Sequence, residues 1–196
     1  MASEPPRFVE AAAFQAQRNY AKSELSYRLF RSLTIGVLGF GAIGQATGRL
    51  FKDAGFQPTP LGISNDLEDV LATSDSAVSI LPSTPATRYL LTEATLAACA
   101  DKKPVFINAG RGDVVSAQTL LRALALGYLS TAVLDVFETE PLPRESALWM
   151  HPSVHVTPHV AAKCFVEDVA DTFAANLDLY FAEKPMNYAV DWASGY

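Results

Sequence analysis

The sequence has few cysteines, no long apolar run and no excess of basic residues, and each of these absences excludes a class of protein. Two cysteines, Cys99 and Cys164, are too few for a disulfide framework in 196 residues, so we expect reduced thiols and a cytoplasmic protein. The apolar runs are shorter than a membrane-spanning helix requires, and no signal-peptide core is present. A net charge of −6 argues against nucleic acid as a partner, because phosphate binding requires a basic face.

Short apolar segments alternate with amphipathic ones, and this alternation predicts the fold class. The strands are expected at residues 33–38, 77–81, 104–108, 131–135 and 154–156. The helices are expected at residues 10–31, 42–54, 65–73, 95–100, 116–126 and 166–181, the third opened by a capping box of Asn65 and Glu68. Residues 57–64, which include Pro58, Pro60 and Gly62, are expected to be irregular. We therefore predict an α/β fold, a Rossmann-like doubly wound parallel sheet with flanking N- and C-terminal helices.

A glycine-rich segment, Gly39–Gly44, follows the first predicted strand and opens the next predicted helix. In a dinucleotide-binding loop, the first glycine allows the tight turn, the second lets the backbone approach a pyrophosphate, and the third permits close packing of helix on strand. Here these glycines are Gly39, Gly41 and Gly44, and the phosphates would lie at the amino end of the helix. A strand-to-helix turn without a ligand is the alternative interpretation.

The remainder of the dinucleotide fingerprint is absent from the sequence. An acidic residue about 20 positions after the glycines usually ends the second strand and holds the adenosine ribose. Counting on from Gly44 reaches residues 64–66, which have the pattern of a helix cap and not of a strand end. The choice between NAD and NADP therefore cannot be made from the sequence.

Three further segments carry an arginine, a glutamate and a histidine. Arg111 follows the strand at 104–108, and it lies at the carboxyl end where open α/β sheets place their ligands. Glu140 precedes Pro141, and His159 follows Pro158, so a proline restricts the backbone beside each of these two residues. Taken singly, they would be a surface arginine in a turn, a solvated loop acid and a capping or core histidine.

Three histidines, His151, His155 and His159, are spaced by four residues, as metal ligands on one face of a helix can be. Prolines and β-branched residues make this segment extended instead, so the three side chains would not share a face. We therefore predict no metal site.

Together, the glycine loop, the Arg, Glu and His segments and the run Leu81–Thr87 resemble the NAD(P)-dependent D-isomer-specific 2-hydroxyacid dehydrogenases, in particular the glyoxylate/hydroxypyruvate reductase branch. The resemblance implies that Arg111 binds the carboxylate of a small 2-oxo acid and polarises its carbonyl group. It also implies that Glu140 pairs with His159 and that the protonated ring donates to the carbonyl oxygen as hydride arrives. The cofactor contacts that the resemblance implies are Gly39, Gly41, Ala42, Ile43, Gly44, Leu81, Pro82, Thr87, Ala109, Gly110, Arg111, Asp135 and His159, with Asp135 at the nicotinamide amide.

Family members have two domains and more than 300 residues, so the resemblance also bears on domain organisation. Residues 1–32 are expected to be a linker helix, residues 33–160 the NAD(P)-binding domain with a deletion near 57–60, and residues 161–196 a C-terminal helix and tail. The first functional hypothesis is a reductase of glyoxylate or hydroxypyruvate, as a homodimer or paired with a full-length subunit. The alternatives are a catalytically inactive truncated isoform or fragment that acts as a dinucleotide-binding or subunit-interaction module, and a dinucleotide-sensing interaction module.

Overall fold

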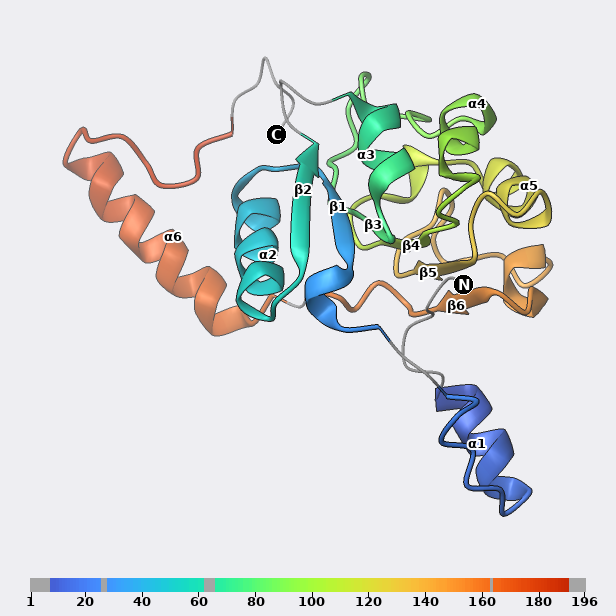
Figure 1. The fold of residues 1–196 in the computed structure, drawn as a ribbon. Coiled ribbons are helices and arrows are strands. Elements are labelled where there is room, and N and C mark those ends of the chain that lie inside the picture. The colour runs from blue at the N-terminus through green and yellow to red at the C-terminus, as the bar shows by residue number, and fades with distance from the viewer. Residues whose placement is uncertain (1–7, 26–27, 62–65, 163, 191–196) are drawn as a thin grey trace.

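The computed structural model describes residues 8–25, 28–61, 66–162 and 164–190, and these contain one six-stranded parallel sheet (Figure 1). The strands are β1 (Thr34–Leu38), β2 (Gln57–Leu61), β3 (Ser76–Ser79), β4 (Val105–Asn108), β5 (Thr131–Leu134) and β6 (Val154–Val156). Their order in the sheet is β2-β1-β3-β4-β5-β6, and all five neighbouring pairs are parallel. The predicted Rossmann-like fold class is thereby confirmed.

Helices cover both faces of the sheet. The described α-helices are α1 (Phe8–Ala16), α2 (Ala42–Asp53), α3 (Leu67–Thr73), α4 (Glu93–Leu96), α5 (Ala117–Ala125) and α6 (Val166–Phe181), of which α2 to α5 cover the sheet. The 3₁₀ helices are η1 (Phe30–Ser32), η2 (Ala97–Cys99), η3 (Gly112–Val114) and η4 (Ala147–Met150). Figure 1 shows α2 on one side of the sheet, α3, α4 and α5 on the other, and α1 and α6 projecting from the body of the molecule.

Alternate residues of the strands supply the two halves of the hydrophobic core. Leu38, Ala77 and Phe106 belong to the larger buried cluster, which also includes residues of α3, η2 and α5. Val37 and Val78 point to the opposite face and pack with aromatic side chains from α2 and the segment after it. Both faces of the central strands are therefore apolar, as a parallel sheet between two helical layers requires.

The stretch around Pro58 and Pro60 is a correction to the sequence-based expectation, because residues 57–61 form β2 and are not irregular. This strand lies at the edge of the sheet, and β1 is its one partner among the described strands. The N–H of Gln57 donates to the carbonyl oxygen of Leu33 at 3.0 Å, so alternate residues of β2 face β1. The ring nitrogens of the two prolines consequently face away from β1, where an edge strand tolerates the lack of an N–H donor.

The N-terminal helix is a second correction. It was expected over residues 10–31 but ends at Ala16, and Arg18 has a left-handed backbone with φ of 55°. The apolar spacing that favoured a longer helix included Tyr20, whose side chain is 91% exposed. A helix continued through this segment would gain no burial for that ring, and packing of an apolar face supplies most helical stability in proteins.

Other boundaries differ from the expectations by one or two residues. Asp66 caps α3 by accepting a hydrogen bond from the N–H of Glu68 at 2.9 Å, whereas the expected capping residue, Asn65, lies outside the described residues. The predicted helix at 95–100 is divided into α4 and η2, and α6 has its predicted ends. None of the helices within the described ranges is long and apolar enough to cross a membrane.

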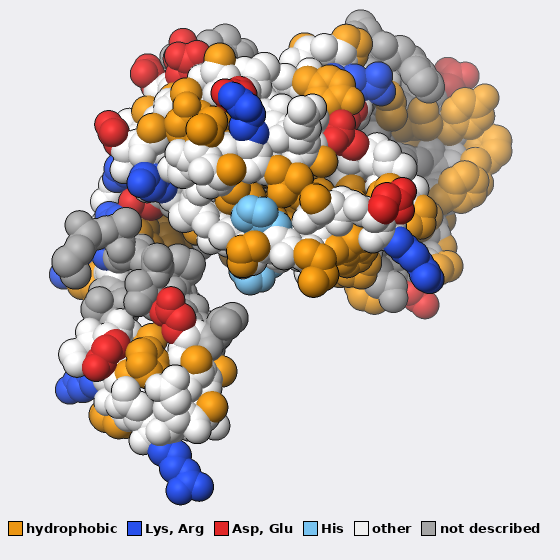
Figure 2. Space-filling view, turned by 90° about the vertical axis from the view of Figure 1, so that its right-hand side faces the viewer, with side chains coloured by type: hydrophobic (Ala, Val, Ile, Leu, Met, Phe, Trp, Pro, Cys, Tyr) orange, Lys and Arg blue, Asp and Glu red, His pale blue; other side chains and the backbone are white. Residues whose placement is uncertain are grey.

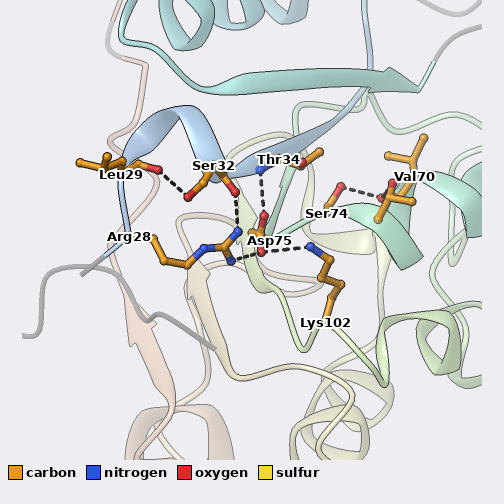
Figure 3. A network of polar contacts seen from close by, with 9 residues as sticks. Arg28, Leu29, Ser32, Thr34, Val70, Ser74, Asp75 and Lys102 are labelled. Atoms are coloured by element: carbon orange, nitrogen blue, oxygen red, sulfur yellow. Dashed lines mark hydrogen bonds and ion pairs between the residues drawn. The ribbon is translucent and has the colours of Figure 1, made fainter. Parts of the chain in front are cut away.

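A polar network joins the segment before β1 to the amino ends of the strands (Figure 3). The carboxylate of Asp75 accepts hydrogen bonds from the Arg28 guanidinium at 2.6 Å and the Thr34 N–H at 2.8 Å, and the Lys102 ammonium lies 3.4 Å away. Burial by itself would raise the pKa of Asp75, but these donors and charges outweigh it and hold the pKa below its usual value. The network fixes this end of the sheet and leaves the carboxyl ends for the candidate site.

Candidate active site

A cleft of about 1020 Å³ lies at the carboxyl ends of the central strands. Its lining comes from the glycine loop after β1, the segment after β3, the loop after β4, the end of β5 and the segment after β6. The lining residues are Gly39, Phe40, Gly41, Ala42, Ile43, Gly44, Ile80, Leu81, Pro82, Thr84, Ala86, Thr87, Ala109, Gly110, Arg111, Asp135, His159 and Ala162. All thirteen residues expected to contact the cofactor are among them, so the fold brings the predicted set together. Its role in binding stays a prediction.

The cleft has additional lining residues that the sequence did not single out. Phe40 lies inside the glycine loop, and Thr84 and Ala86 lie inside the run Leu81–Thr87, so the motif boundaries would have identified them. Ile80 and Ala162 lie just outside the motifs and carry no comparable signal. Figure 2 shows one face of the molecule, on which the Lys and Arg side chains of the described segments are scattered and form no continuous patch.

The geometry of the glycine loop separates two roles for its glycines. Gly39 has φ of 98°, and a Cβ placed on Gly44 would overlap the carbonyl oxygen of Gly39, so both glycines are required by the turn itself. A Cβ placed on Gly41 would meet no atom within 4 Å in the parts of the chain that the structure covers. The packing of the protein therefore does not require a glycine at position 41. The open space beside Gly41 is what a dinucleotide-binding loop needs for close approach of a pyrophosphate.

The amino end of α2 offers hydrogen-bond donors to this space. Gly41 is its N-cap and supplies no side-chain cap. The first N–H groups of a helix have no partner inside the helix, and the helix dipole adds partial positive charge at this end. The residues present therefore fit the phosphates of a dinucleotide.

Arg111 lies in the loop after β4, which packs closely on the segment after β3. A Cβ on Gly110 would come within 2.6 Å of the Leu81 carbonyl oxygen, so the two loops touch through their backbones. The Asn108 amide donates to the Arg111 carbonyl oxygen at 3.0 Å, and the Arg111 guanidinium donates to the Gly110 carbonyl oxygen at 2.8 Å. Across the described segments, Arg111 forms no ion pair with a carboxylate. Its remaining N–H groups can therefore bind an anion in the cleft.

His159 and Glu140 come together although 19 residues separate them in sequence. The Nδ1 atom of His159 lies 2.8 Å from Oε2 of Glu140, and Oε1 of Glu140 accepts a hydrogen bond from the Phe137 N–H at 3.0 Å. Burial would raise the pKa of Glu140, but the hydrogen bonds from His159 and Phe137 and the His159 charge lower it overall. Since Glu140 occupies Nδ1, Nε2 is the ring atom left for proton exchange in the cleft.

Asp135 organises the loop that carries His159. Its carboxylate accepts hydrogen bonds from the Thr157 hydroxyl at 2.5 Å and from the N–H groups of Val160 at 3.0 Å and Ala161 at 2.8 Å. The His159 N–H donates to the Asp135 carbonyl oxygen at 2.8 Å, and His159 itself has φ of 52°. Sequence reasoning gave Asp135 a nicotinamide contact, which stays a prediction, and missed this role because no local pattern reports such contacts.

The three histidines spaced by four residues, His151, His155 and His159, were considered as metal ligands in the sequence. No cluster of three or more His, Cys, Asp and Glu side chains with metal-binding geometry occurs among the residues that the structure describes. His151 instead accepts a hydrogen bond at Nδ1 from the Ser153 N–H at 3.2 Å.

Residues 6–161 match the family model described as "D-isomer specific 2-hydroxyacid dehydrogenase, NAD binding domain". The chain belongs to the D-isomer specific 2-hydroxyacid dehydrogenase family. Members of this family are NAD(P)-dependent dehydrogenases and reductases, and the match includes the glycine loop, Arg111, Glu140 and His159. The resemblance inferred from the motifs is confirmed.

Named relatives of this chain within the family belong to the predicted branch. It is 35% identical over 176 residues to glyoxylate/hydroxypyruvate reductase A of Photorhabdus laumondii, and this alignment covers 83% of this chain and 55% of the relative. It is 36% identical over 172 residues to glyoxylate reductase of Pyrococcus furiosus, and this alignment covers 78% of this chain and 49% of the relative. The chain therefore spans about half the length of these curated relatives.

Solved structures of 2-hydroxyacid dehydrogenases share the fold of this chain. The NADPH-dependent glyoxylate/hydroxypyruvate reductase of Sinorhizobium meliloti, in complex with NADP and sulfate, aligns with a TM-score of 0.88 and 32% identity over 97% of this chain and 65% of that chain. A D-isomer specific 2-hydroxyacid dehydrogenase of Xanthobacter autotrophicus Py2, in complex with NADPH and MES, aligns with a TM-score of 0.88 and 31% identity over 97% of this chain and 83% of that chain.

Proposed function

We propose that this chain binds NAD or NADP and uses the reduced cofactor to convert a small 2-oxo acid, of the glyoxylate or hydroxypyruvate type, into a D-2-hydroxy acid. The observation that carries the proposal is the composition of one cleft. A glycine loop with an open position at Gly41, the Arg111 guanidinium and the His159–Glu140 pair all lie at it or directly beside it. We propose residues 33–160 as the cofactor-binding domain, flanked by residues 1–32 and 161–196.

The chain would hold the cofactor through its backbone. N–H groups at the start of α2 would bind the pyrophosphate, and Gly41 would let it approach the helix. Leu81, Pro82 and Thr87 would form one wall, with Ala109 and Gly110 beside them. The bound cofactor supplies the hydride. The named relatives that carry NADP or NADPH in their structures support this assignment.

The substrate would be oriented and protonated by three side chains. Arg111 would hold its carboxylate through parallel hydrogen bonds and polarise the carbonyl group. The Nε2 atom of His159 would donate a proton to the carbonyl oxygen, and in the reverse direction it would accept the hydroxyl proton. Glu140 would hold Nδ1, which fixes the orientation of the ring.

A dinucleotide-binding module without turnover is the second candidate, and the exposure of the acid–base pair favours it. The side chains of His159 and Glu140 are 49% and 36% exposed to solvent. Hydride transfer to a carbonyl group is helped by a site that excludes water. A chain that binds the cofactor but leaves His159 and Glu140 exposed to water would bind the dinucleotide without reducing a substrate. It would then act as a dinucleotide-binding module, as a subunit-interaction module, or as both.

Calorimetric titration of the purified chain with NADPH, and separately with NADH, tests the binding step. We expect a dissociation constant at or below about 100 μM, which corresponds to roughly 5–6 kcal/mol. Hydroxypyruvate and glyoxylate turnover, measured next by cofactor absorbance, separates the reductase from the binding module. A folded sample that gives no heat up to millimolar cofactor would refute both candidates.

Arg111→Lys tests the assignment of the carboxylate-binding residue. Because lysine cannot form two parallel hydrogen bonds, we expect kcat/KM for hydroxypyruvate to fall by about ten- to a hundredfold. Arg122→Lys is the matched control, since Arg122 pairs with Glu93 between α5 and α4 and lines no part of the cleft. Equal turnover in the two variants would show that Arg111 does not bind the substrate.

A further inference from the structure

Two loops at the carboxyl ends of neighbouring strands form adjoining walls of the cleft. The first loop, residues 82–91, follows β3 and carries Thr87, and the second loop, residues 109–115, follows β4 and carries Arg111. They touch at their roots, where Gly110 packs on the backbone of the first wall. Under the proposed function, the first wall borders the cofactor and the second holds the substrate. What joins the two loops farther out therefore bears on the distance between the reactants.

Backbone hydrogen bonds join the end of the first loop to the second loop. The Tyr89 N–H donates to the Asp113 carbonyl oxygen at 2.7 Å, and the Leu91 N–H donates to the Val114 carbonyl oxygen at 3.0 Å. Tyr89 has φ of 50°, a conformation that non-glycine residues rarely adopt, so this contact requires a defined turn. These bonds hold residues 89–91 and do not reach the beginning of the loop, where the residues that line the cleft lie.

The Asp113 carboxylate connects the second loop to the beginning of the first. Its Oδ2 atom accepts a hydrogen bond from the Ser83 hydroxyl at 2.6 Å and lies 3.0 Å from Nε of Arg88. The Arg88 side chain is 63% exposed, whereas that of Asp113 is 23% exposed. Exposed ion pairs contribute little because water screens them, so the short hydrogen bond between Ser83 and Asp113 is the stronger part of this connection.

The Ser83–Asp113 hydrogen bond links two local turns that carry proposed site residues. Arg111 is the N-cap of η3, and Asp113 lies inside the same short helix. On the other side, Ser83 is followed by Thr84, whose N–H donates to the Thr87 hydroxyl at 2.8 Å. A displacement of either turn is therefore resisted by the other.

We propose that Asp113 and Ser83 are positioning residues, because their hydrogen bond holds the second loop, with Arg111, against the first. The substrate carboxylate would thereby lie at a fixed distance from the bound cofactor. Neither Asp113 nor Ser83 is among the residues that line the cleft in the described parts of the chain, so neither is proposed to touch cofactor or substrate. The contact between the loops stands without the proposed function, whereas its effect on turnover rests on that function.

Amide hydrogen exchange, followed by NMR, measures the loop contact without any cofactor. The reporter is the Tyr89 amide, because its acceptor is a backbone oxygen of the other loop that every variant retains. Ser83→Ala and Asp113→Ala should each speed its exchange by about five- to fiftyfold, since a hydrogen bond to a charged group is lost. Asp113→Asn keeps an acceptor oxygen for the Ser83 hydroxyl and should stay within about threefold of wild type.

Ser74→Ala is the matched control for Ser83→Ala. Both serine hydroxyls donate at 2.6 Å, but Ser74 donates to the Val70 carbonyl oxygen, which lies outside the two loops. A loop amide exchanges through local opening, so Ser74→Ala should leave the exchange of the Tyr89 amide unchanged.

A double-mutant cycle distinguishes one shared contact from two separate stabilising roles. Ser83→Ala should have no further effect on Tyr89 exchange once Asp113→Ala is present. Unchanged exchange in either single alanine variant, or additive effects in the double variant, would overturn the proposal whether or not the chain binds a dinucleotide.

Turnover kinetics test the consequence for the site. The pyrophosphate would bind at the amino end of α2, which neither loop forms, so Asp113→Ala should change the NADPH dissociation constant by less than about threefold. Its kcat for hydroxypyruvate should fall by about ten- to a hundredfold, because a displaced substrate no longer meets the hydride in a reactive geometry. Asp113→Asn should keep at least about a third of the wild-type kcat.

This division between binding and turnover separates positioning from stability. A loss of stability alone would leave kcat per folded molecule unchanged, as we expect for Ser74→Ala. Unchanged kcat in Asp113→Ala, together with faster Tyr89 exchange, would overturn the positioning role. If the wild-type chain reduces no substrate, the proposed function fails by itself, and the exchange and double-mutant experiments still decide whether Ser83 and Asp113 hold the loops together.

Discussion

At the residue scale, two buried or half-buried carboxylates show how this chain uses charge to hold separate segments together. Asp135 and Asp75 each accept hydrogen bonds from backbone and side-chain donors that come from separate segments. Burial acts to raise the pKa of both, and the donors lower it overall. Asp135 thereby shapes the His159 loop, and Asp75 holds the opposite end of the sheet.

Asp75→Asn should destabilise the fold by about 1–2 kcal/mol at pH 7, because it removes the charge that Arg28, Lys102 and the Thr34 N–H surround. Since the folded pKa is depressed, this stabilisation is present above the unfolded value of about 3.9 and is lost as pH falls through the folded pKa. Urea unfolding of wild type and variant at pH 7 and in acid measures the difference, with exposed Asp101→Asn as control. A difference that grows on acidification would contradict this account.

Ser79 and Ser74 allow the stability cost of a buried hydroxyl without a hydrogen-bond partner to be compared with that of a buried hydroxyl that has one. Both side chains are fully buried, but Ser74 donates to the Val70 carbonyl oxygen at 2.6 Å, whereas Ser79 Oγ has no partner among the described residues. We expect Ser79→Ala to stabilise the fold by about 1 kcal/mol and Ser74→Ala to destabilise it by about the same amount. Denaturant midpoints measure both, and a loss of stability in Ser79→Ala would indicate that its hydroxyl is satisfied.

At the scale of elements, the junction of β1 and α2 separates what the fold requires from what a ligand requires. Gly44 must be glycine because its Cβ would lie on the backbone of Gly39, whereas Gly41 borders open space. The sequence motif predicted close packing at Gly44 and approach of a pyrophosphate at Gly41, and the structure shows the close packing at Gly44 and open space at Gly41. The distinction leads to opposite expectations for two similar substitutions.

Gly44→Ala should lower the free energy of unfolding by about 1–3 kcal/mol, since α2 must move away from β1 to make room. Gly41→Ser should leave stability within about 0.5 kcal/mol of wild type, because serine is a good N-cap, but should weaken cofactor binding at least tenfold by filling the space over the helix. Thermal unfolding and calorimetric titration of the two variants test the pair. Full cofactor affinity in Gly41→Ser would place the phosphates elsewhere.

Helices and strands were predictable from the sequence where short-range patterns decide the structure. The strand and helix around the glycine loop follow from an apolar run, a turn and a helical repeat, all of which act over short distances. β2 was missed because prolines usually break strands, and its place at the sheet edge is decided by distant segments. The N-terminal helix was overextended because periodicity does not report whether a partner surface exists.

At the scale of the whole molecule, α6 projects from the sheet (Figure 1). It exposes an apolar stripe. The stripe has helical spacing, and its side chains are between 41% and 80% exposed. Its residues are Val166, Val169, Phe173, Leu177 and Tyr180. Exposed contiguous apolar surface favours association. A groove of about 690 Å³ runs along the same helix.

We expect the isolated chain to self-associate through this stripe as its concentration rises. Replacing both Phe173 and Leu177 by glutamine should shift the chain toward monomer, because the aromatic ring of Phe173 and the branched side chain of Leu177 are removed from the contact surface. Ala175→Gln, about half a turn away on the opposite side of α6, is the control. Sedimentation velocity over a range of concentrations measures the association. An unchanged distribution in the double variant would exclude α6 as the contact.

The sequence by itself determined the local chemistry of this protein. The glycine loop, the Arg111, Glu140 and His159 segments and the alternation of strands and helices are short-range patterns, and they indicated the family and fold. The tertiary structure decided which of these groups meet, since parallel strands bring their carboxyl ends to one edge from distant parts of the chain. The Asp135 contacts and the exposed α6 stripe depend on such long-range packing, which residue spacing does not encode.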